Sequence, residues 1–492
     1  MENGKNVLAI DLGASSGRAI LGSFDGKRIK LEELHRFLNE PVQLNQTLYW
    51  DVLRLMHDIK IGLQKAAQVD FQSVGIDTWG VDFGLLDEDG NLLENPVHYR
   101  DKRTEGMFDL AFSQYDKERF YELSGNQFME INTVFQLLSL KNSRPRLLSQ
   151  AKTLLLMPDL LNYFLTGEKA SEYTIASTTQ MLNAREKVWS KEIIHSLGLP
   201  EDILTNVIEP GTILSPIRTE ILDELMIKPA SVVAVAGHDT QCAMVAVPAI
   251  EEDFLFISCG TWSLFGTELS EALISEKSKQ YNMTNEGGYG GKISFLKNII
   301  GLWLIQESRR QWEREGLTYN FSELEREAQK ATPFLAFIDP DAPEFVAPGN
   351  IPERIREYCK RTNQNIPKEI GEIVRCINES LAMKYRYVME QIEDCTQKNY
   401  DTIYMVGGGT NSHMLCQLTA NACNKKVVAG PTEATVYGNV ALQLIALGEI
   451  SDLTKARECI RNSEDLICYE PQEEQKWSEA YQRFLSHCKF EE

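Results

Sequence analysis

A repeating unit runs through the whole sequence: a short apolar segment is followed by a longer segment with helical spacing of apolar residues. The short segments, which predict strands, are residues 7–10, 74–76, 231–236, 254–257 and 403–406. Helical spacing is clearest at residues 52–63, where Asp51 is positioned as the N-cap, and at residues 370–392. This alternation of strands and helices predicts an α/β protein.

The length of the chain indicates more than one domain. A single hydrophobic core stops growing near about 250–300 residues, and this chain has 492. A charged, proline-containing stretch at residues 247–253 separates two apolar segments close to the midpoint. We therefore predict an N-terminal domain over residues 1–247 and a C-terminal domain over residues 248–492.

Charge and residue usage exclude several classes of protein. The formal net charge is −21, and no basic patch is present to attract the backbone of a nucleic acid. The apolar run near the N-terminus is too short for a signal peptide, and no stretch is long enough for a membrane helix. The ten cysteines lack metal-ligand spacing, so zinc is not expected and reduced thiols are; whether Cys359 and Cys376 pair is left open. We expect a cytoplasmic monomer or small homo-oligomer without nucleic-acid or membrane partners.

Glycine turns directly follow three of the predicted strands. The first, at residues 11–18, reads DLGASSGR; its backbone N–H groups and serine hydroxyls suit phosphate oxygens, and Asp11 suits a Mg²⁺ held through water. A plain β-hairpin is the alternative for this segment. The second turn, SCGTWS at residues 258–263, and the third, GGGTN at residues 407–411, complete the set. Three such turns spread over both halves predict one nucleotide held between two domains.

The candidate for chemistry is the segment Gly237-His238-Asp239-Thr240, which ends one predicted strand and opens an apolar helix. A carboxylate at this position is suited to accept a proton from a hydroxyl nucleophile. The alternative is that Asp239 is only a helix N-cap and that His238 is only a hydrogen-bonding neighbour.

A polyol pocket is suggested by residues 75–82, GIDTWGVD, in which carboxylates and small residues surround one tryptophan. Carboxylates accept hydrogen bonds from sugar hydroxyls, and an aromatic face suits the CH groups of a sugar. The alternative is that Trp79 belongs to the core, which is the commoner position for tryptophan.

With these segments in view, the chain resembles the FGGY family of carbohydrate kinases. The matching stretches occur in order from residue 10 to about residue 440: IDLGASSGR, GIDTWGVDFGLLD, YRDKRTEG, LMPDLLNYFLTG, GHDT, SCGTWSL, TNEGG, LKNIIGLWLIQ, VGGGTNSHML and AGPTEATVYGN. The GIDTWGVDF and HDT elements point, within the family, to kinases of a 6-deoxy ketose. The resemblance implies two actin-like (ribonuclease H-like) ATPase domains with a central interdomain cleft that holds ATP and the sugar.

The resemblance also implies roles for residues at matching positions. Asp239 would be the general base that removes the proton of the C1 hydroxyl as it attacks the γ-phosphate of ATP, and Asp11 would support Mg²⁺. The sugar would contact Gly80, His238, Thr240 and Asn298, and Trp79 and Val81 are our own candidates for an apolar part of the pocket. ATP would contact Ala14, Ser15, Ser16, Gly17, Arg18, Thr261, Gln306, Gly407, Gly408 and Asn411.

Two rivals remain open from the sequence. One is a kinase of the same family that acts on another ketose, such as L-fuculose or xylulose. The other is an actin-like or chaperone-type ATPase, which shares the fold but has no need of a base directed at a sugar hydroxyl.

Overall fold

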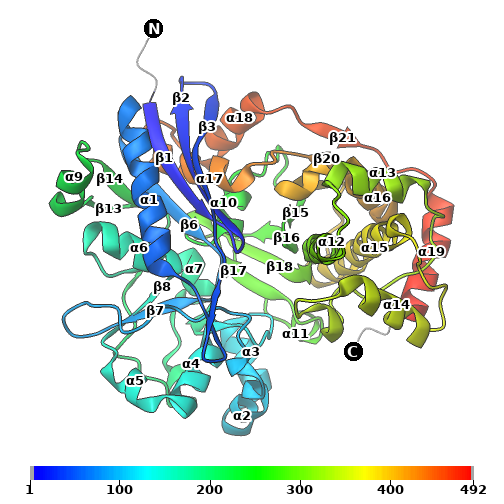
Figure 1. Cartoon of the computed structure of the whole chain (residues 1–492), viewed down its shortest axis with the longest axis horizontal. Helices are drawn as coiled ribbons and strands as arrows, with labels where there is room; N and C mark the ends of the chain where they lie inside the picture. The colour runs from blue at the N-terminus through cyan, green and yellow to red at the C-terminus, as the bar shows by residue number, and fades with distance from the viewer. Residues whose placement is uncertain (1–4, 489–492) are drawn as a thin grey trace. The chain divides into compact units, whose positions relative to one another are not determined.

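The chain forms two compact units in a computed structural model that describes residues 5–488. Unit 1 combines residues 1–246, 269–295 and 434–464, and unit 2 combines residues 247–268, 296–433 and 465–492. Both units mix helices and strands, as predicted (Figure 1). We describe each unit by itself.

The central sheet of unit 1 has six strands in the order β13-β14-β6-β1-β2-β3. β1 is parallel to β6, β6 is parallel to β14, and the remaining pairs are antiparallel. The strand bounds are β1 (Lys5–Leu12), β2 (Ser16–Phe24), β3 (Ile29–Leu38), β6 (Ser73–Thr78), β13 (Thr212–Pro216) and β14 (Ser231–Ala234). The three parallel strands therefore have their carboxyl ends at one edge of this sheet.

Helices cover both faces of this sheet. The main ones are α1 (Val52–Ala66), α6 (Met157–Thr166), α10 (Asp239–Val245), α17 (Ala434–Ala446) and α18 (Leu453–Ser463). The smaller elements of unit 1 are β4 (Val42–Leu44), β5 (Thr47–Tyr49), β7 (Phe83–Leu86), β8 (Thr153–Leu156), β9 (Ser171–Glu172), β10 (Leu182–Asn183), β11 (Val188–Trp189), β12 (Val207–Ile208), β17 (Thr284–Gly287), α2 (Met107–Gln114), α3 (Lys117–Ser124), α4 (Thr133–Ser143), α5 (Pro145–Gln150), α7 (Tyr173–Ser177), α8 (Lys191–Ser196), α9 (Thr219–Leu225) and α11 (Glu276–Gln280).

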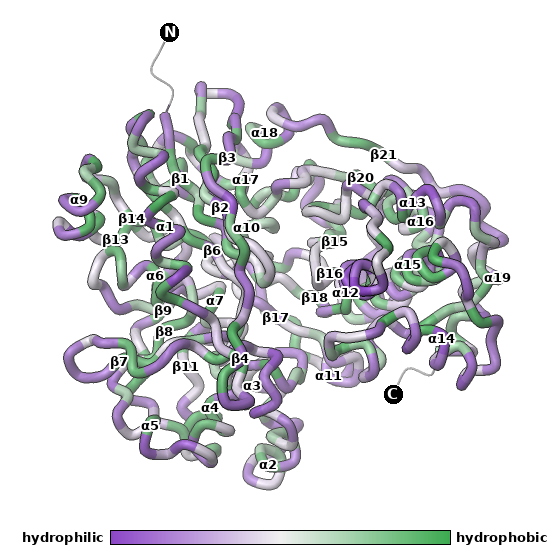
Figure 2. The backbone as a smooth tube through the Cα atoms, viewed as in Figure 1, coloured by the Kyte–Doolittle hydropathy of each residue, from purple (hydrophilic) through white to green (hydrophobic). Residues whose placement is uncertain are grey.

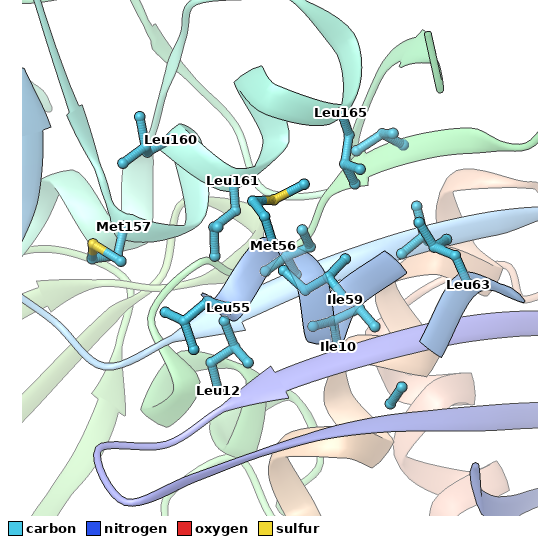
Figure 3. Packing of buried hydrophobic residues seen from close by; sticks show 14 of the residues in the cluster. Ile10, Leu12, Leu55, Met56, Ile59, Leu63, Met157, Leu160, Leu161 and Leu165 are labelled. Carbon is cyan, nitrogen blue, oxygen red and sulfur yellow. The ribbon is translucent and has the colours of Figure 1, made fainter. Parts of the chain in front are cut away.

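Helix α1 forms where the spacing predicted it. The Asp51 side chain accepts a hydrogen bond from the Arg54 N–H and caps the first turn. Hydrophobic and hydrophilic residues alternate along the helix (Figure 2), and its apolar side chains pack with those of β1 and α6 (Figure 3). Each fully buried Leu or Ile in such a cluster contributes roughly 1.5–3 kcal/mol through burial.

Helix α17 packs on the opposite face of the sheet, where a β-carbon at Gly22 of β2 would meet its Val440. Side chains alternate between the two faces along a strand. Ile10 and Leu12 of β1 belong to the cluster shown in Figure 3, so Asp11 lies on the other face. Helices α10 and α17 approach closely there: a β-carbon at Gly438 would lie 1.8 Å from the Cys242 carbonyl oxygen. This glycine is therefore required by helix packing.

In unit 2 the strands lie in the order β18-β16-β15-β19-β20-β21. Their bounds are β15 (Leu255–Cys259), β16 (Trp262–Leu269), β18 (Ile293–Ile300), β19 (Thr402–Val406), β20 (Lys426–Ala429) and β21 (Ile467–Tyr469). The helices of unit 2 are α12 (Trp303–Arg314), α13 (Phe321–Lys330), α14 (Ile351–Arg361), α15 (Ile370–Thr396), α16 (His413–Cys423) and α19 (Glu474–His487). The long stripe predicted at residues 370–392 thus lies in one helix, α15.

The two units repeat one strand pattern. Each begins with an antiparallel hairpin, β1–β2 or β15–β16, and continues with two parallel neighbours, β6 and β14 or β19 and β20. An antiparallel strand, β13 or β21, ends each series. The first two glycine turns, at residues 11–18 and 258–263, therefore occupy equivalent places in the two sheets.

Among the residues that the structure describes, no helix is long and apolar enough to cross a bilayer. All ten cysteines lie in the described part of the chain, and all are free thiols, including Cys359 and Cys376.

Candidate active site

The candidate residues of unit 1 meet at the carboxyl edge of its parallel strands. Asp11 pairs in register with Asp77 on the neighbouring strand, so both side chains point to the same face. One strand further on, the backbone of His238 bridges to Thr78, and the Thr78 N–H donates to the Gly237 carbonyl at 2.9 Å. This arrangement brings the first glycine turn and the His238–Asp239 pair to one edge.

Asp239 is the reachable carboxylate of this group. It is the first residue of α10, and its side chain is 32% exposed, whereas that of Asp11 is 9% exposed and that of Glu286 is 6% exposed. Its Oδ1 accepts hydrogen bonds from the Thr240 N–H at 2.5 Å and the Thr240 hydroxyl at 3.2 Å. His238, not Asp239, is the N-cap residue of α10. Asp239 therefore keeps an oxygen available for a ligand.

Carboxylates outnumber cations at this edge. The Arg18 guanidinium binds Asp11, while the fully buried Asp77 accepts a hydrogen bond only on Oδ2, from Asn439 at 2.6 Å. Burial and the neighbouring Asp11 carboxylate raise the pKa of Asp77 well above its ordinary value. The pKa of Asp239 is also raised, by loss of hydration and by Asp11, although His238 opposes this shift.

The loop that carries His238 and Asp239 is anchored by another buried acid, Glu172. Its carboxylate accepts hydrogen bonds from the N–H groups of Thr174, Ile175 and Gly237, the last at 2.8 Å. Burial raises the pKa of Glu172 to about 7, against the lowering effect of these hydrogen bonds. The Glu172 N–H in turn donates to Asp159, another buried acid.

His238 lies between two acids. Its Nδ1 is 3.1 Å from Oε2 of Glu286 on β17, and its Nε2 is 3.5 Å from Oδ1 of Asp239. A β-carbon at Gly80 would lie 3.5 Å from Nε2 of His238, so these two predicted sugar-contacting residues are neighbours. Unit 1 thus brings together Gly80, His238, Asp239 and Thr240.

The segment predicted as a polyol pocket, residues 75–82, needs a correction. Its carboxylates are not presented to a ligand: Asp77 and Asp82 are both fully buried. Asp82 accepts hydrogen bonds from the indoles of Trp50 at 2.6 Å and Trp79 at 2.9 Å, and also from the Gln136 amide and the Tyr99 N–H. Burial raises the pKa of Asp82 to about 6. Both acids are therefore structural acceptors.

Trp79 and Val81 are also largely buried, with 5% and 8% of their surface exposed. The Trp79 ring packs against Trp50 with centroids 4.0 Å apart. Val81 has a positive φ of 68°, which is strained for a β-branched residue. Hydrogen bonds from its N–H to Thr178 and from the Thr133 hydroxyl to its carbonyl hold this conformation.

The first glycine turn is the tip of the β1–β2 hairpin. Ala14, Ser15 and Ser16 lie at the tip, and Asn39 holds it by donating to the Gly13 carbonyl at 2.8 Å. Gly17 has a packing reason for its missing side chain: a β-carbon there would lie 2.3 Å from the Phe37 ring.

In unit 2, five of the predicted residues lie near the ends of β15 and β19. The Thr261 hydroxyl donates to the Gln306 amide oxygen at 3.3 Å. Gly407 has a positive φ of 86°, and β-carbons at Gly407 or Gly409 would meet Cys259, the last residue of β15. Gly408 has open space at its α-carbon, and Asn411 donates to its carbonyl at 3.2 Å. Asn298 lies on β18 in the same unit.

Sequence reasoning missed Glu286, Glu172 and Asn439 as members of this site. Glu286 and Asn439 stood within the quoted segments TNEGG and AGPTEATVYGN, but neither had a role. Their partners, His238 and Asp77, lie dozens to hundreds of residues away in the chain. For Glu286 and Glu172 the one signal available was a lone acid among small and polar residues, and Asn439 had none.

Two family models match successive parts of this chain. The model of the FGGY family of carbohydrate kinases, N-terminal domain, matches residues 6–246, and that of the C-terminal domain matches residues 255–447. The chain is 43% identical over 464 residues to the rhamnulokinase of Oceanobacillus iheyensis, covering 94% of this chain and 97% of the relative. It is 42% identical over 482 residues to the rhamnulokinase of Bacteroides thetaiotaomicron, covering 98% and 99%.

Solved structures agree on the fold. A ligand-bound xylulose kinase from Lactobacillus acidophilus aligns with a TM-score of 0.81 at 18% identity, covering 98% of this chain and 97% of the other. A glycerol kinase from Plasmodium falciparum with ADP aligns with a TM-score of 0.77 at 15% identity, covering 99% of each chain. The predicted pair of actin-like domains is confirmed as a two-domain sugar-kinase fold.

Proposed function

Because the chain belongs to the FGGY family of carbohydrate kinases, we propose that it is an ATP-dependent kinase that phosphorylates L-rhamnulose on its C1 hydroxyl. The products are L-rhamnulose 1-phosphate and ADP, and the reaction belongs to L-rhamnose catabolism. Support for this sugar comes from the full-length similarity to relatives named rhamnulokinase.

The observation that carries the proposal is the partly exposed carboxylate of Asp239 among buried acids. As general base, Asp239 takes the proton from the C1 hydroxyl while that oxygen attacks the γ-phosphorus. Base catalysis of this kind contributes typically 10²–10⁴-fold to the rate. The two hydrogen bonds from Thr240 fix Oδ1, so the carboxylate cannot rotate freely away from the nucleophile.

We assign the contacts with the sugar hydroxyls to Gly80, His238 and Thr240, which lie around this base in unit 1, and to Asn298 of unit 2. The absence of a side chain at Gly80 leaves room beside Nε2 of His238. Because L-rhamnulose is a 6-deoxy ketose, its methyl group needs an apolar contact, for which Trp79 and Val81 are the candidates.

ATP binding is assigned to two groups of residues. In unit 1, the hairpin tip of Ala14, Ser15 and Ser16, with Gly17 and Arg18, offers N–H groups, hydroxyls and one guanidinium to the phosphates. In unit 2, Thr261, Gln306, Gly407, Gly408 and Asn411 are assigned to the nucleotide. The open space at Gly408 suits close approach of a flat or anionic group to the backbone.

Magnesium binding is assigned to Asp11. Among the described residues, no cluster of three or more acidic, histidine or cysteine side chains is arranged to hold a metal by itself. Mg²⁺ usually takes one or two carboxylates together with phosphates and waters, and Asp11, in a locally acidic edge, fits that requirement. When bound, the ion would neutralise charge on the phosphates of ATP. A cytoplasmic location and a monomer or small homo-oligomer stay predictions.

The proposal is tested with a ketose panel in the presence of ATP and Mg²⁺, by following ADP release. We expect turnover with L-rhamnulose above that with L-fuculose or xylulose, and ³¹P NMR of the product should show a phosphate ester at C1. Background turnover with L-rhamnulose beside clear turnover with another ketose would replace the sugar. ADP release that needs no sugar would instead favour a non-metabolic actin-like ATPase.

A further inference from the structure

Glu286 is the buried acid of unit 1 that directly faces His238. It lies on β17 with 4% of its surface exposed, and its Oε2 is 3.1 Å from Nδ1 of His238. The Gln241 amide donates to the same oxygen at 3.0 Å, and the Ser294 hydroxyl donates to Gln241 at 2.8 Å. The Gln241 amide is therefore a neutral donor that holds Glu286 in place, and the His238 ring faces the same carboxylate oxygen.

His238 cannot move away from this carboxylate easily. Its backbone bridges to Thr78 of the central sheet, and the N–H of Gly237 before it donates to Glu172. Its ring has Glu286 on one side and Asp239 on the other, at 3.1 and 3.5 Å. A histidine fixed between two carboxylates is stabilised in its imidazolium form, in which both ring nitrogens carry protons.

The three carboxylates around His238 all raise its pKa. Glu286 faces it from β17, Asp239 from α10 and Glu172 from the start of α7. Burial by itself lowers the pKa of His238, and the attraction of these three carboxylates outweighs it and raises the pKa. The imidazolium in turn lowers the pKa of Asp239, against burial and the nearby Asp11.

We propose that Glu286 is a positioning residue that keeps His238 protonated, so that the imidazolium holds Asp239 ionised and ready to accept a proton. The three side chains form an alternating series of negative, positive and negative charge, and its last member is the general base. The inference deepens the proposed function and rests on the assignment of Asp239 as the base. It adds a role for Glu286 that neither the sequence nor the comparisons assign.

The variant Glu286→Gln tests this idea because it preserves shape and removes only the charge. Histidine-selective ¹⁵N labelling, with His238→Gln to assign the signals, reports the protonation of the ring without any substrate. We expect the His238 pKa to fall by about one unit or more in Glu286→Gln. We expect Glu286→Asp to retain most of the wild-type value.

The same variant changes the pH profile of catalysis. With a weaker imidazolium beside it, Asp239 would be protonated at higher pH, so the acid limb of the kcat/KM profile should move up by about one pH unit. Activity should then recover toward the wild-type level above this limb. A merely structural defect would lower kcat/KM by the same factor at every pH.

Glu307→Gln is the matched control. Glu307 is also a buried acid, 1% exposed, but it lies in unit 2 and pairs with Arg310 and Arg314. This variant should lose stability while the His238 signal and the shape of the pH profile stay unchanged. An unchanged His238 pKa in Glu286→Gln, or an unshifted acid limb, would overturn the inference. If the wild type phosphorylates no ketose, the proposed function fails, yet the NMR titration still decides whether Glu286 controls His238.

Discussion

The two units treat buried charge differently. In unit 2, Lys384 and Lys297 share their surroundings with Asp339 and Asp341; Lys384 lies 2.9 Å from the first of these acids and 3.0 Å from the second. In unit 1, five acids, Asp11, Asp77, Glu172, Asp239 and Glu286, lie near two basic side chains, Arg18 and His238. A balanced cluster contributes to the fold, whereas an acid excess destabilises it and is typical of a site that serves chemistry.

The pKa directions support this difference. Two aspartates raise the pKa of the nearly buried Lys384, so this lysine stays charged. Burial and like charge raise the pKa values of Asp77 and Asp239, so these acids hold protons more firmly than in water. In the unit 2 cluster, the lysine and the aspartates compensate one another's charge. In the unit 1 cluster, the excess negative charge is reduced when the acids bind protons or when a ligand binds.

The largest effect is expected from breaking the balanced cluster. Lys384→Met leaves Asp339 and Asp341 without their cation and should lower the free energy of unfolding by about 3 kcal/mol, measured by urea denaturation. Lys398→Met is the control, because Lys398 pairs with Asp253 at the surface, where both side chains are about half exposed. That change should cost less than about 1 kcal/mol. Equal losses of unfolding free energy in the two variants would show that the buried ion pairs of Lys384 contribute no more to stability than the surface pair of Lys398.

In unit 1, the corresponding change should affect catalysis instead of stability. Asp239→Asn removes the proposed base and one of the mutually repelling charges, so kcat should fall at least ~10²-fold while the thermal midpoint stays level or rises. Asp58→Asn provides the contrast: Asp58 is buried but compensated by Arg54 and His35, at 2.8 and 2.9 Å. This control should lose stability and keep its kcat. Undiminished sugar-dependent turnover in Asp239→Asn would remove Asp239 from its role.

The third prediction compares a buried tryptophan proposed to contact the sugar, Trp79, with one that lies in the core of unit 2, Trp477. Trp79→Phe loses the indole N–H that donates to Asp82 and changes the ring proposed to contact the sugar, so KM for the ketose should rise about tenfold. Trp477→Phe, in unit 2, removes a similar volume from a core position that is 2% exposed. It should lower the thermal midpoint without changing KM. A KM for Trp79→Phe equal to that of the wild type would leave Trp79 as core only.

The smallest effect concerns pH and stability. In the folded state the pKa values of Asp77 and Glu172 lie above their unfolded values, and the pKa of folded Glu172 is about 7. The folded chain therefore binds more protons, and the free energy of unfolding should fall from pH 7 to pH 8, by up to about 1.4 kcal/mol for each such proton. The raised pKa of His238 acts in the same direction.

Asp77→Asn removes one of these protons from the balance, so its stability should fall less over this pH interval. Urea denaturation at pH 7 and pH 8, without added Mg²⁺, provides the comparison. Lys398→Met should retain the wild-type slope, because it changes a surface ion pair and removes no buried acid. A steeper fall in Asp77→Asn than in the wild type would contradict the assigned direction.

The sequence predicted those parts of the fold that depend on neighbours in the chain. Local spacing and apolar content predicted the Asp51 cap, the helix at residues 370–392 and the strands at residues 7–10 and 403–406, which form within α15, β1 and β19. Likewise, the segment Gly237–Thr240 stood out because a strand, a glycine and an acid succeed one another. These signals need no knowledge of tertiary structure.

Contacts between distant segments were beyond that reasoning. The pairing of Glu286 with His238 depends on β17 lying beside the start of α10, which no local pattern encodes. The same holds for Asp82: as an acid within a polar motif it suggested a ligand, but its oxygens accept from Trp50 and Gln136, which come from other parts of the fold. Whether a carboxylate faces a ligand or the core is decided by packing.

The contact of Asn439 with Asp77 joins two parts of unit 1 that are translated at different times. Its amide donates to Asp77, 362 residues earlier in the chain, and Gln443 beside it donates to the Leu8 carbonyl. At about 5–20 residues per second, a ribosome needs roughly 20–70 s to proceed from the first partner to the second. During that interval the sheet of unit 1 lacks α17, and the face that carries Asp11 and Asp77 is uncovered. The first half of unit 1 therefore completes its core only after a segment 362 residues further along the chain has been translated.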